Sequence, residues 1–166
     1  MLDLLARLIN GSVNWAERRS HARRMREYVG ISPRATIGIG SKLIGTKPHF
    51  VVGEMSYLNL AHLSCGAHSR VVIGRSCAIG YNVSIKAITH SLHKPTHNEA
   101  GPIIHLERDI VIGDDCWIGD NVYIREGVTL GNNVIVGANS VVTRSVPDNQ
   151  VIAGVPARVI KERRCA

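Results

Sequence analysis

The sequence has few aromatic residues and few cysteines, and both shortages narrow the range of folds. Phe, Tyr and Trp make up 4% of the 166 residues, although 45% of the chain is hydrophobic. A core of Ile, Val and small side chains is typical of narrow, stacked structures, whereas globular α/β cores usually contain more aromatic residues. None of the four cysteines lies in a CxxC pair, so neither a disulfide framework nor a zinc knuckle is predicted.

The sequence also lacks a long hydrophobic run and an excess of negative charge. No segment approaches the roughly 20 apolar residues that cross a bilayer. The N-terminus has no signal-peptide pattern, because its charged residues follow its short apolar stretch. We therefore expect a cytoplasmic protein. The net charge of +7 favours an anionic partner. Without a module of aromatic and basic residues for base stacking, we expect no nucleic-acid partner.

An aliphatic residue followed by glycine recurs every six residues in two blocks of the chain. The pairs are Ile73-Gly74, Ile79-Gly80, Ile112-Gly113, Ile118-Gly119, Leu130-Gly131 and Val136-Gly137. A period of six is neither helical nor the alternation of an ordinary strand. It is typical of a hexapeptide β-helix, in which short parallel strands stack into a three-sided prism. Three hexapeptides form one coil of about eighteen residues, so we expect roughly five coils.

The predicted order along the chain is an N-terminal helical segment, the prism, a loop extruded from the prism and a short tail. The helical segment is predicted over residues 1–32 and the prism over 33–162. The loop, within the prism, is predicted over 87–107, and the tail over 163–166. The first segment is predicted to be helical over 2–28, with an interruption at Gly11 and Ser12, and is strongly basic after Trp15. One interpretation is a cap over the open end of the prism. The other, compatible with it, is an anchor on a membrane surface.

The corners and the end of the prism have their own sequence signals. We expect left-handed backbone at the repeat glycines and at Asn82, Asn121, Asn133 and Asn139. Cys77 and Cys116 fall on the small-residue position of the repeat and are expected in the core. Pro147 and Pro156 are expected to prevent further strand pairing where the chain leaves the prism.

The loop that interrupts the repeat is rich in histidine, with His90, His93, His97 and His105. Irregular excursions from a rigid scaffold are where catalytic and binding residues concentrate. Histidine is mostly neutral yet basic at cellular pH, so His90 suits the role of a general base. An exposed histidine without a function fits the spacing equally well. The spacing His90-x2-His93-x3-His97 also fits a metal site, and the residues alone leave these interpretations open.

The complete set of motifs resembles one enzyme family. The histidine-bearing loop contains the sequence THSLH. The repeat that resumes after it contains DDCWIGDN, and the C-terminal motif is VIAGVPARVIKER. Over about residues 52–162 the chain is similar to the hexapeptide-repeat O-acetyltransferases, especially those of maltose, galactosides, nodulation factors and polysaccharides. The resemblance implies an all-β fold, namely a left-handed parallel β-helix. It also implies a homotrimer, with acetyl-CoA bound between neighbouring prisms.

The resemblance assigns roles by position. His90 stands where the family has its catalytic histidine, and no metal is expected. Tyr57 and Asn59 match a segment that faces the acceptor, and His93 is expected at the mouth of the same site. The residues expected to contact acetyl-CoA are Trp117, Asp120, Ala138, Thr143, Arg144, Arg158 and Lys161.

The implied reaction is direct acetyl transfer to a saccharide hydroxyl, in the assembly of surface polysaccharide or lipopolysaccharide. Sugar acetyltransferases of the family carry an acidic residue where this chain has Ser64 to Ala67, and this departure favours a larger saccharide. The basic N-terminal segment favours peripheral contact with the inner face of the membrane. The alternative functions are a metalloenzyme similar to γ-class carbonic anhydrases and a non-catalytic β-helix scaffold.

Overall fold

The computed structural model describes residues 2–91 and 105–163, with side chains from residue 12 onward. A single helix, α1 (Leu2–Met25), precedes all the strands. It continues through Gly11 and Ser12, so the predicted interruption is wrong. One glycine costs a helix about 1 kcal/mol, and the surrounding Leu, Ala and Arg residues favour helix strongly enough to offset that cost. No helix in the described ranges is both long and apolar enough to cross a bilayer.

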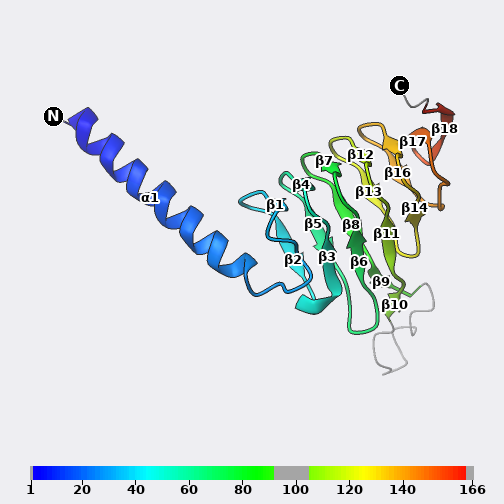
Figure 1. Cartoon of the computed structure of the whole chain (residues 1–166), viewed down its shortest axis with the longest axis horizontal. Coiled ribbons are helices and arrows are strands. Elements are labelled where there is room, and N and C mark those ends of the chain that lie inside the picture. Colours follow the sequence, from blue (N-terminus) through cyan, green and yellow to red (C-terminus); the bar gives the residue numbers. More distant parts are fainter. Residues whose placement is uncertain (1, 92–104, 164–166) are drawn as a thin grey trace, which may run out of the picture.

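In the described part of the chain, all strands except β9 and β10 form three sheets, one on each face of a prism. From β1 to β8 and again from β11 to β16, each strand lies on the face after that of the strand before it, and the coils stack side by side (Figure 1). Face A contains β3 (Phe50–Val52), β6 (Val71–Ile73), β11 (Ile110–Ile112) and β14 (Thr129–Leu130). Face B contains β1 (Thr36–Ile37), β4 (Tyr57–Leu58), β7 (Ala78–Ile79), β12 (Trp117–Ile118), β15 (Ile135–Val136), β17 (Gln150–Gly154) and β18 (Ala157–Glu162). Face C contains β2 (Lys42–Ile44), β5 (His62–Ser64), β8 (Ser84–Lys86), β13 (Tyr123–Ile124) and β16 (Val141–Val142).

Each coil lies directly on the previous one. Hydrogen bonds between neighbouring coils join residues 21 apart before the loop, 39 apart across it, and 18 and then 16 apart after it. The predicted eighteen-residue coil therefore applies only after the loop. The earlier coils are longer because their corners between faces C and A contain extra residues, such as the short 3-10 helix η1 (Lys47–His49).

The aliphatic positions of the repeat point into the prism and form its core. The fully buried side chains include Ile73, Ile79, Ile85, Ile112, Ile118, Ile124 and Leu130. Burying one such side chain stabilises the fold by about 1.5–3 kcal/mol, so the stack is held mainly by aliphatic contacts between coils. Cys77 and Cys116 are buried among them, as predicted. The six-residue repeat therefore predicts the core residues correctly.

The repeat glycines have a different role from the predicted one. Asn82, Asn121, Asn133 and Asn139 do adopt left-handed backbone, with φ between 55° and 59°. The six repeat glycines, which all lie in the described part of the chain, do not. A Cβ atom added to Gly74 would lie 2.7 Å from the carbonyl oxygen of Gly113 in the next coil. Glycine is therefore needed there for the close approach of two backbones and not for its φ angle.

The C-terminal end of the prism continues further than predicted. Pro147 does not stop strand pairing, because β17 begins three residues later and pairs with β15 in parallel. The chain then reverses through Pro156, and β18 pairs antiparallel to β17. Both prolines lie outside the strands, so neither removes an N–H group from the ladder. This hairpin extends face B beyond the last complete coil.

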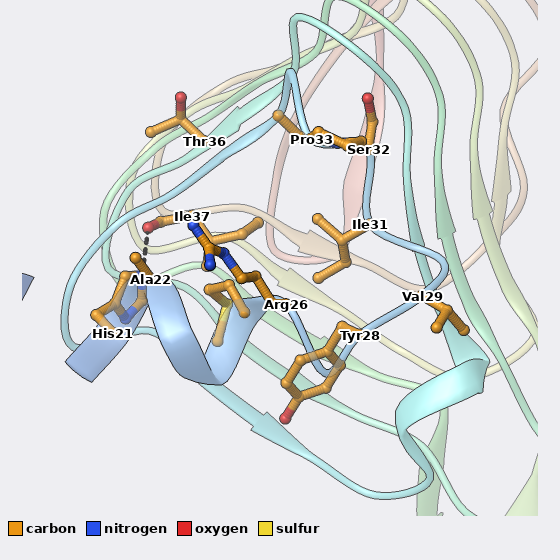
Figure 2. Close-up of a pocket in the computed structure, with 12 residues that line it drawn as sticks. His21, Ala22, Arg26, Tyr28, Val29, Ile31, Ser32, Pro33, Thr36 and Ile37 are labelled. Carbon is orange, nitrogen blue, oxygen red and sulfur yellow. Dashed lines mark hydrogen bonds between the residues drawn. The ribbon is translucent and has the colours of Figure 1, made fainter. Parts of the chain in front are cut away.

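Helix α1 touches the prism only near its C-terminal end and otherwise projects away from it (Figure 1). Its attachment is the buried ring of His21, whose Nε2 lies 2.7 Å from the carbonyl oxygen of Ile37 (Figure 2). Met25 and Tyr28 pack against the core beside it. A cavity of about 680 Å³ remains next to this junction, with Arg26 and Ile31 in its lining. The helix therefore covers the open end with its last turns alone.

We predict that Gly74→Ala destabilises the protein by about 1–3 kcal/mol, because the added methyl group must push two coils apart. Gly137→Ala is the comparison variant: its Cβ would be 2.9 Å from the Cβ of Ala153 but no closer than 3.6 Å to a backbone atom, so a smaller shift of the coils accommodates it. Thermal unfolding followed by circular dichroism should give a Tm several degrees lower for Gly74→Ala than for Gly137→Ala. Equal Tm values for the two variants would contradict the close-approach explanation.

Candidate active site

The loop that interrupts the repeat is an arm, formed in its described part by β9 (Ile88–His90) and β10 (His105–Glu107). It leaves the prism after Ala87, at the corner between faces C and A. His90 is paired with His105 across this antiparallel ladder, and the centres of the two rings are 5.2 Å apart. Both side chains are exposed to solvent. The arm thus presents a pair of imidazoles outside the prism.

Only part of the histidine-rich loop is among the described residues. His93 and His97 lie outside the described residues, so the predicted role of His93 at the acceptor remains a prediction. Among the residues that are described, no group of three or more His, Cys, Asp or Glu side chains is placed to hold a metal ion.

Glu107, which the sequence analysis did not single out, fastens the arm to the prism. Its carboxylate accepts hydrogen bonds from the backbone N–H of His68 at 2.6 Å and from the hydroxyl of the buried Ser69 at 3.3 Å. The carboxylate lies over Gly66, where a Cβ atom would overlap it. The N–H of His68 is the main reason why the pKa of Glu107 is lowered. The two partners are 39 residues apart, so no local motif signals this contact.

Strands of face B carry the predicted acceptor residue Tyr57 and the predicted cofactor residue Trp117 in one row. Tyr57 pairs with Ala78, and Ala78 pairs with Trp117, so the two aromatic residues are separated by one strand. Strands are about 4.8 Å apart, so the two backbones are about 10 Å apart. The side chains of Tyr57 and Trp117 are 47% and 56% exposed. Asn59 follows Tyr57 and is half-buried.

Asp120 and Ala138 follow the row of aromatic residues, at the edge of face B. The carboxylate of Asp120 accepts a hydrogen bond from the backbone N–H of Tyr81 in the preceding coil, at 2.8 Å. Its backbone carbonyl accepts one from the N–H of Asn139. Ala138 lies directly under Gly119, whose added Cβ would be 2.7 Å from the Ala138 nitrogen. Both predicted cofactor residues therefore contribute to coil stacking.

The remaining predicted cofactor residues lie at the C-terminal end of the prism. Thr143 is half-buried and follows β16, and the next residue, Arg144, is exposed. Arg158 and Lys161 are exposed on β18. Lys161 also lines a cavity of about 560 Å³ together with Ile135. This end of the molecule therefore presents the three predicted cations, and Arg163 lines the same cavity as Lys161.

One chain does not bring His90 together with Tyr57 and Trp117 on face B. Face B is opposite the corner between faces C and A, from which the arm extends. In Figure 1, β9 and β10 lie below the stack, whereas β7 and β12 lie along its upper edge. His90 and Trp117 of the same chain are therefore on opposite sides of the prism.

The buried thiols are poor candidates for nucleophiles. The Sγ of Cys77 donates to the carbonyl of Gly113 at 3.0 Å, and that of Cys116 donates to the carbonyl of Gly131 at 3.1 Å. Interaction with Cys77 and burial raise the pKa of Cys116. Both thiols are buried inside the prism and are not accessible to a substrate.

Comparison with known proteins supports this architecture. Residues 109–144 match the bacterial transferase hexapeptide model, which comprises six repeats. Over this segment the chain is similar to the hexapeptide-repeat transferases. This confirms the predicted all-β, left-handed parallel β-helix. A Dictyostelium discoideum protein named as an acetyltransferase is 40% identical over 111 residues, which are 67% of this chain and 56% of that protein. The chain thus spans about half the length of this curated relative.

Two solved structures of hexapeptide-repeat acetyltransferases have the same fold. One is a Vibrio cholerae O1 biovar eltor acetyltransferase complexed with acetyl coenzyme A; it has a TM-score of 0.72 and 25% identity, covering 89% of this chain and 79% of that one. The other is a galactoside acetyltransferase in complex with coenzyme A, with a TM-score of 0.64 and 33% identity, covering 78% of this chain and 65% of that one. The predicted resemblance to this family is thus confirmed, and the residue roles remain predictions.

The Glu107 contact predicts a pH dependence of the arm. The pKa of Glu107 is lowered in the folded protein. The hydrogen bond from the His68 N–H to the ionised Glu107 carboxylate is therefore fully formed above the ordinary glutamate pKa of about 4.3. This hydrogen bond is lost as the pH falls through the lower pKa that Glu107 has in the folded protein. In proton–nitrogen NMR spectra, the His68 amide signal should titrate with a midpoint below 4.3. Glu107→Gln should abolish this titration, and a midpoint at the ordinary value would contradict the proposed contact.

Proposed function

We propose that the protein is an acetyl-CoA-dependent O-acetyltransferase that acts on a saccharide hydroxyl, with His90 as general base. The main support is a hexapeptide-repeat prism, similar to acetyltransferases bound to acetyl-CoA or CoA, that carries an exposed histidine on its one extruded arm among the described residues. The name of the galactoside enzyme supports a saccharide acceptor. Surface polysaccharide or lipopolysaccharide assembly is the process we propose.

The reaction proceeds by direct transfer. The imidazole of His90 accepts the proton of the acceptor hydroxyl while the oxygen attacks the thioester carbonyl. The tetrahedral intermediate then collapses, the C–S bond breaks, and the protonated imidazole returns its proton to the CoA sulfur. The products are the acetyl ester and free CoA. The burial of Cys77 and Cys116 supports this route over an acyl-enzyme on either thiol.

The site we propose is shared between two subunits of a homotrimer. His90 and Trp117 lie on opposite sides of one prism, so the imidazole of one subunit must meet face B of a neighbour. A cyclic trimer of prisms forms three equivalent contacts of this kind. Trp117 and Thr143 then lie along acetyl-CoA, and Arg144, Arg158 and Lys161 pair with its phosphates. Asp120 and Ala138 support this surface from the stacked backbone.

The acceptor side of the site favours a larger saccharide. Tyr57 is exposed and Asn59 is half-buried on face B, and both are available to a ring hydroxyl. At the segment from Ser64 to Ala67, the nearby carboxylate comes from Glu107 and is already occupied by the arm contact. A small sugar therefore lacks an acidic partner there, whereas an extended acceptor has face B to contact.

Replacing the proposed base should remove catalysis without unfolding the protein. We expect His90→Ala to reduce the transfer rate about 10²–10⁴-fold, because the side chain is exposed and its loss opens no cavity. A thiol-release assay with polysaccharide fragments and nucleotide sugars would measure this. His62→Ala, a histidine change on face C, is the control and should retain activity. Undiminished turnover by His90→Ala would reject the mechanism.

A shared site also predicts complementation between two inactive variants. His90→Ala and Trp117→Ala should each be defective alone. When the two are refolded together, about one quarter of the interfaces in a random trimer pair an intact His90 with an intact Trp117 of the neighbour. Activity should recover to about that fraction. Failure to recover in a mixture shown by sedimentation to contain mixed trimers would contradict a site shared between two subunits.

A further inference from the structure

Helix α1 presents a long exposed surface that the prism does not cover. Every described residue from Ser12 to Ser20 is exposed, including Trp15 at 61% and Val13 at 51%. Figure 1 shows the helix extending away from the first coils. A helix of 24 residues is about 36 Å long, and only its final turns are attached. This surface has no role in the proposed reaction.

The attached and free sides of the helix carry different side chains. His21 and Met25, four residues apart, face the prism. Trp15, Arg19 and Arg23 are also four residues apart and form a second stripe, which lies on the opposite side because Arg19 and His21 differ by two positions. The guanidinium of Arg19 lies 5.1 Å from the centre of the Trp15 ring. The free stripe is therefore aromatic at one end and cationic along the rest.

Positive charge dominates the free part of the helix. Arg18, Arg24 and Arg26 are exposed in addition to the stripe. Among the described residues of the helix, Glu17 is acidic against these five arginines, and Glu27 beyond the helix is already paired with Lys47. A second copy of the helix would bring the same arginines together, so like-charge repulsion opposes self-association through this surface. A negatively charged partner is favoured instead.

We propose that α1 docks the protein on an anionic bilayer surface through the stripe Trp15, Arg19 and Arg23. Tryptophan partitions to the level of the lipid headgroups, where its ring is buried and its N–H is hydrated. Arginines next to it pair with lipid phosphates at the same depth. In this arrangement α1 lies along the membrane surface, and the prism is attached at the C-terminal end of the helix. This proposal does not depend on the proposed acetyl transfer.

Vesicle binding by the full-length protein tests the proposal. We expect co-sedimentation with vesicles of phosphatidylcholine and phosphatidylglycerol in 0.1 M salt, and loss of binding to pure phosphatidylcholine. Arg19→Ala/Arg23→Ala should lower the partition coefficient roughly 25-fold, since each arginine near the surface contributes about fivefold. Arg70→Ala/Arg108→Ala removes the same charge from exposed positions on the prism and is the control. Raising the salt to about 0.5 M should weaken binding, because it screens the arginines.

A second variant separates docking from simple charge attraction. Trp15→Ala should weaken binding while leaving the net charge unchanged. Equal binding by the helix double variant and the prism double variant would overturn the proposal, as would equal binding to neutral vesicles. If sedimentation instead shows that the helix variants change the oligomeric state in the absence of lipid, the surface binds a second copy and the membrane proposal is wrong. Circular dichroism should show that all variants remain folded.

Discussion

The structure depends on how closely one coil can approach the next. Hydrogen bonding between coils fixes their separation at about 4.8 Å, and at the corner after face A this leaves no space for a side chain. Gly53, Gly74, Gly113 and Gly131 lie one above another there, and a Cβ atom on any of the first three would meet the backbone of the next at 2.6–2.7 Å. Each glycine thus makes the following coil possible, and the aliphatic core follows from the stacking.

Close stacking also determines what the acidic residues do. The carboxylates of Asp109, Asp114 and Asp120 each accept a hydrogen bond at 2.8 Å from a backbone N–H in the preceding coil. The N–H of Arg75 and its side chain lower the pKa of Asp114. Glu107 makes the same kind of contact, but from the arm. An acidic residue in a repeat of this kind is therefore first a connection between coils, and Asp120 makes this connection at the surface where we propose that acetyl-CoA binds.

The sequence identified the elements whose signals are local and periodic. The six-residue period predicted the core, and the Asn residues at the corners predicted the left-handed turns. It failed where the cause lies between coils. The glycines were assigned to left-handed turns because a sequence does not display the backbone that approaches them. The sequence does not predict the contact of Glu107 because its partner His68 is distant in the chain. Nor does it show where Pro147 lies relative to the strand ladder, and the prediction that Pro147 prevents further strand pairing is therefore wrong.

The narrow cross-section of the prism explains why the chain has few aromatic residues. A prism only a few side chains wide is filled by Ile, Val and Leu, so the core requires few rings, and Phe50 is one that it buries completely. Trp15, Tyr57, Tyr81 and Trp117 are all at least 47% exposed. A large exposed ring loses hydrophobic stabilisation that it would gain by burial. These side chains are therefore available to bind other molecules, on face B and its edge and on the free stripe of α1, and both surfaces carry cations nearby.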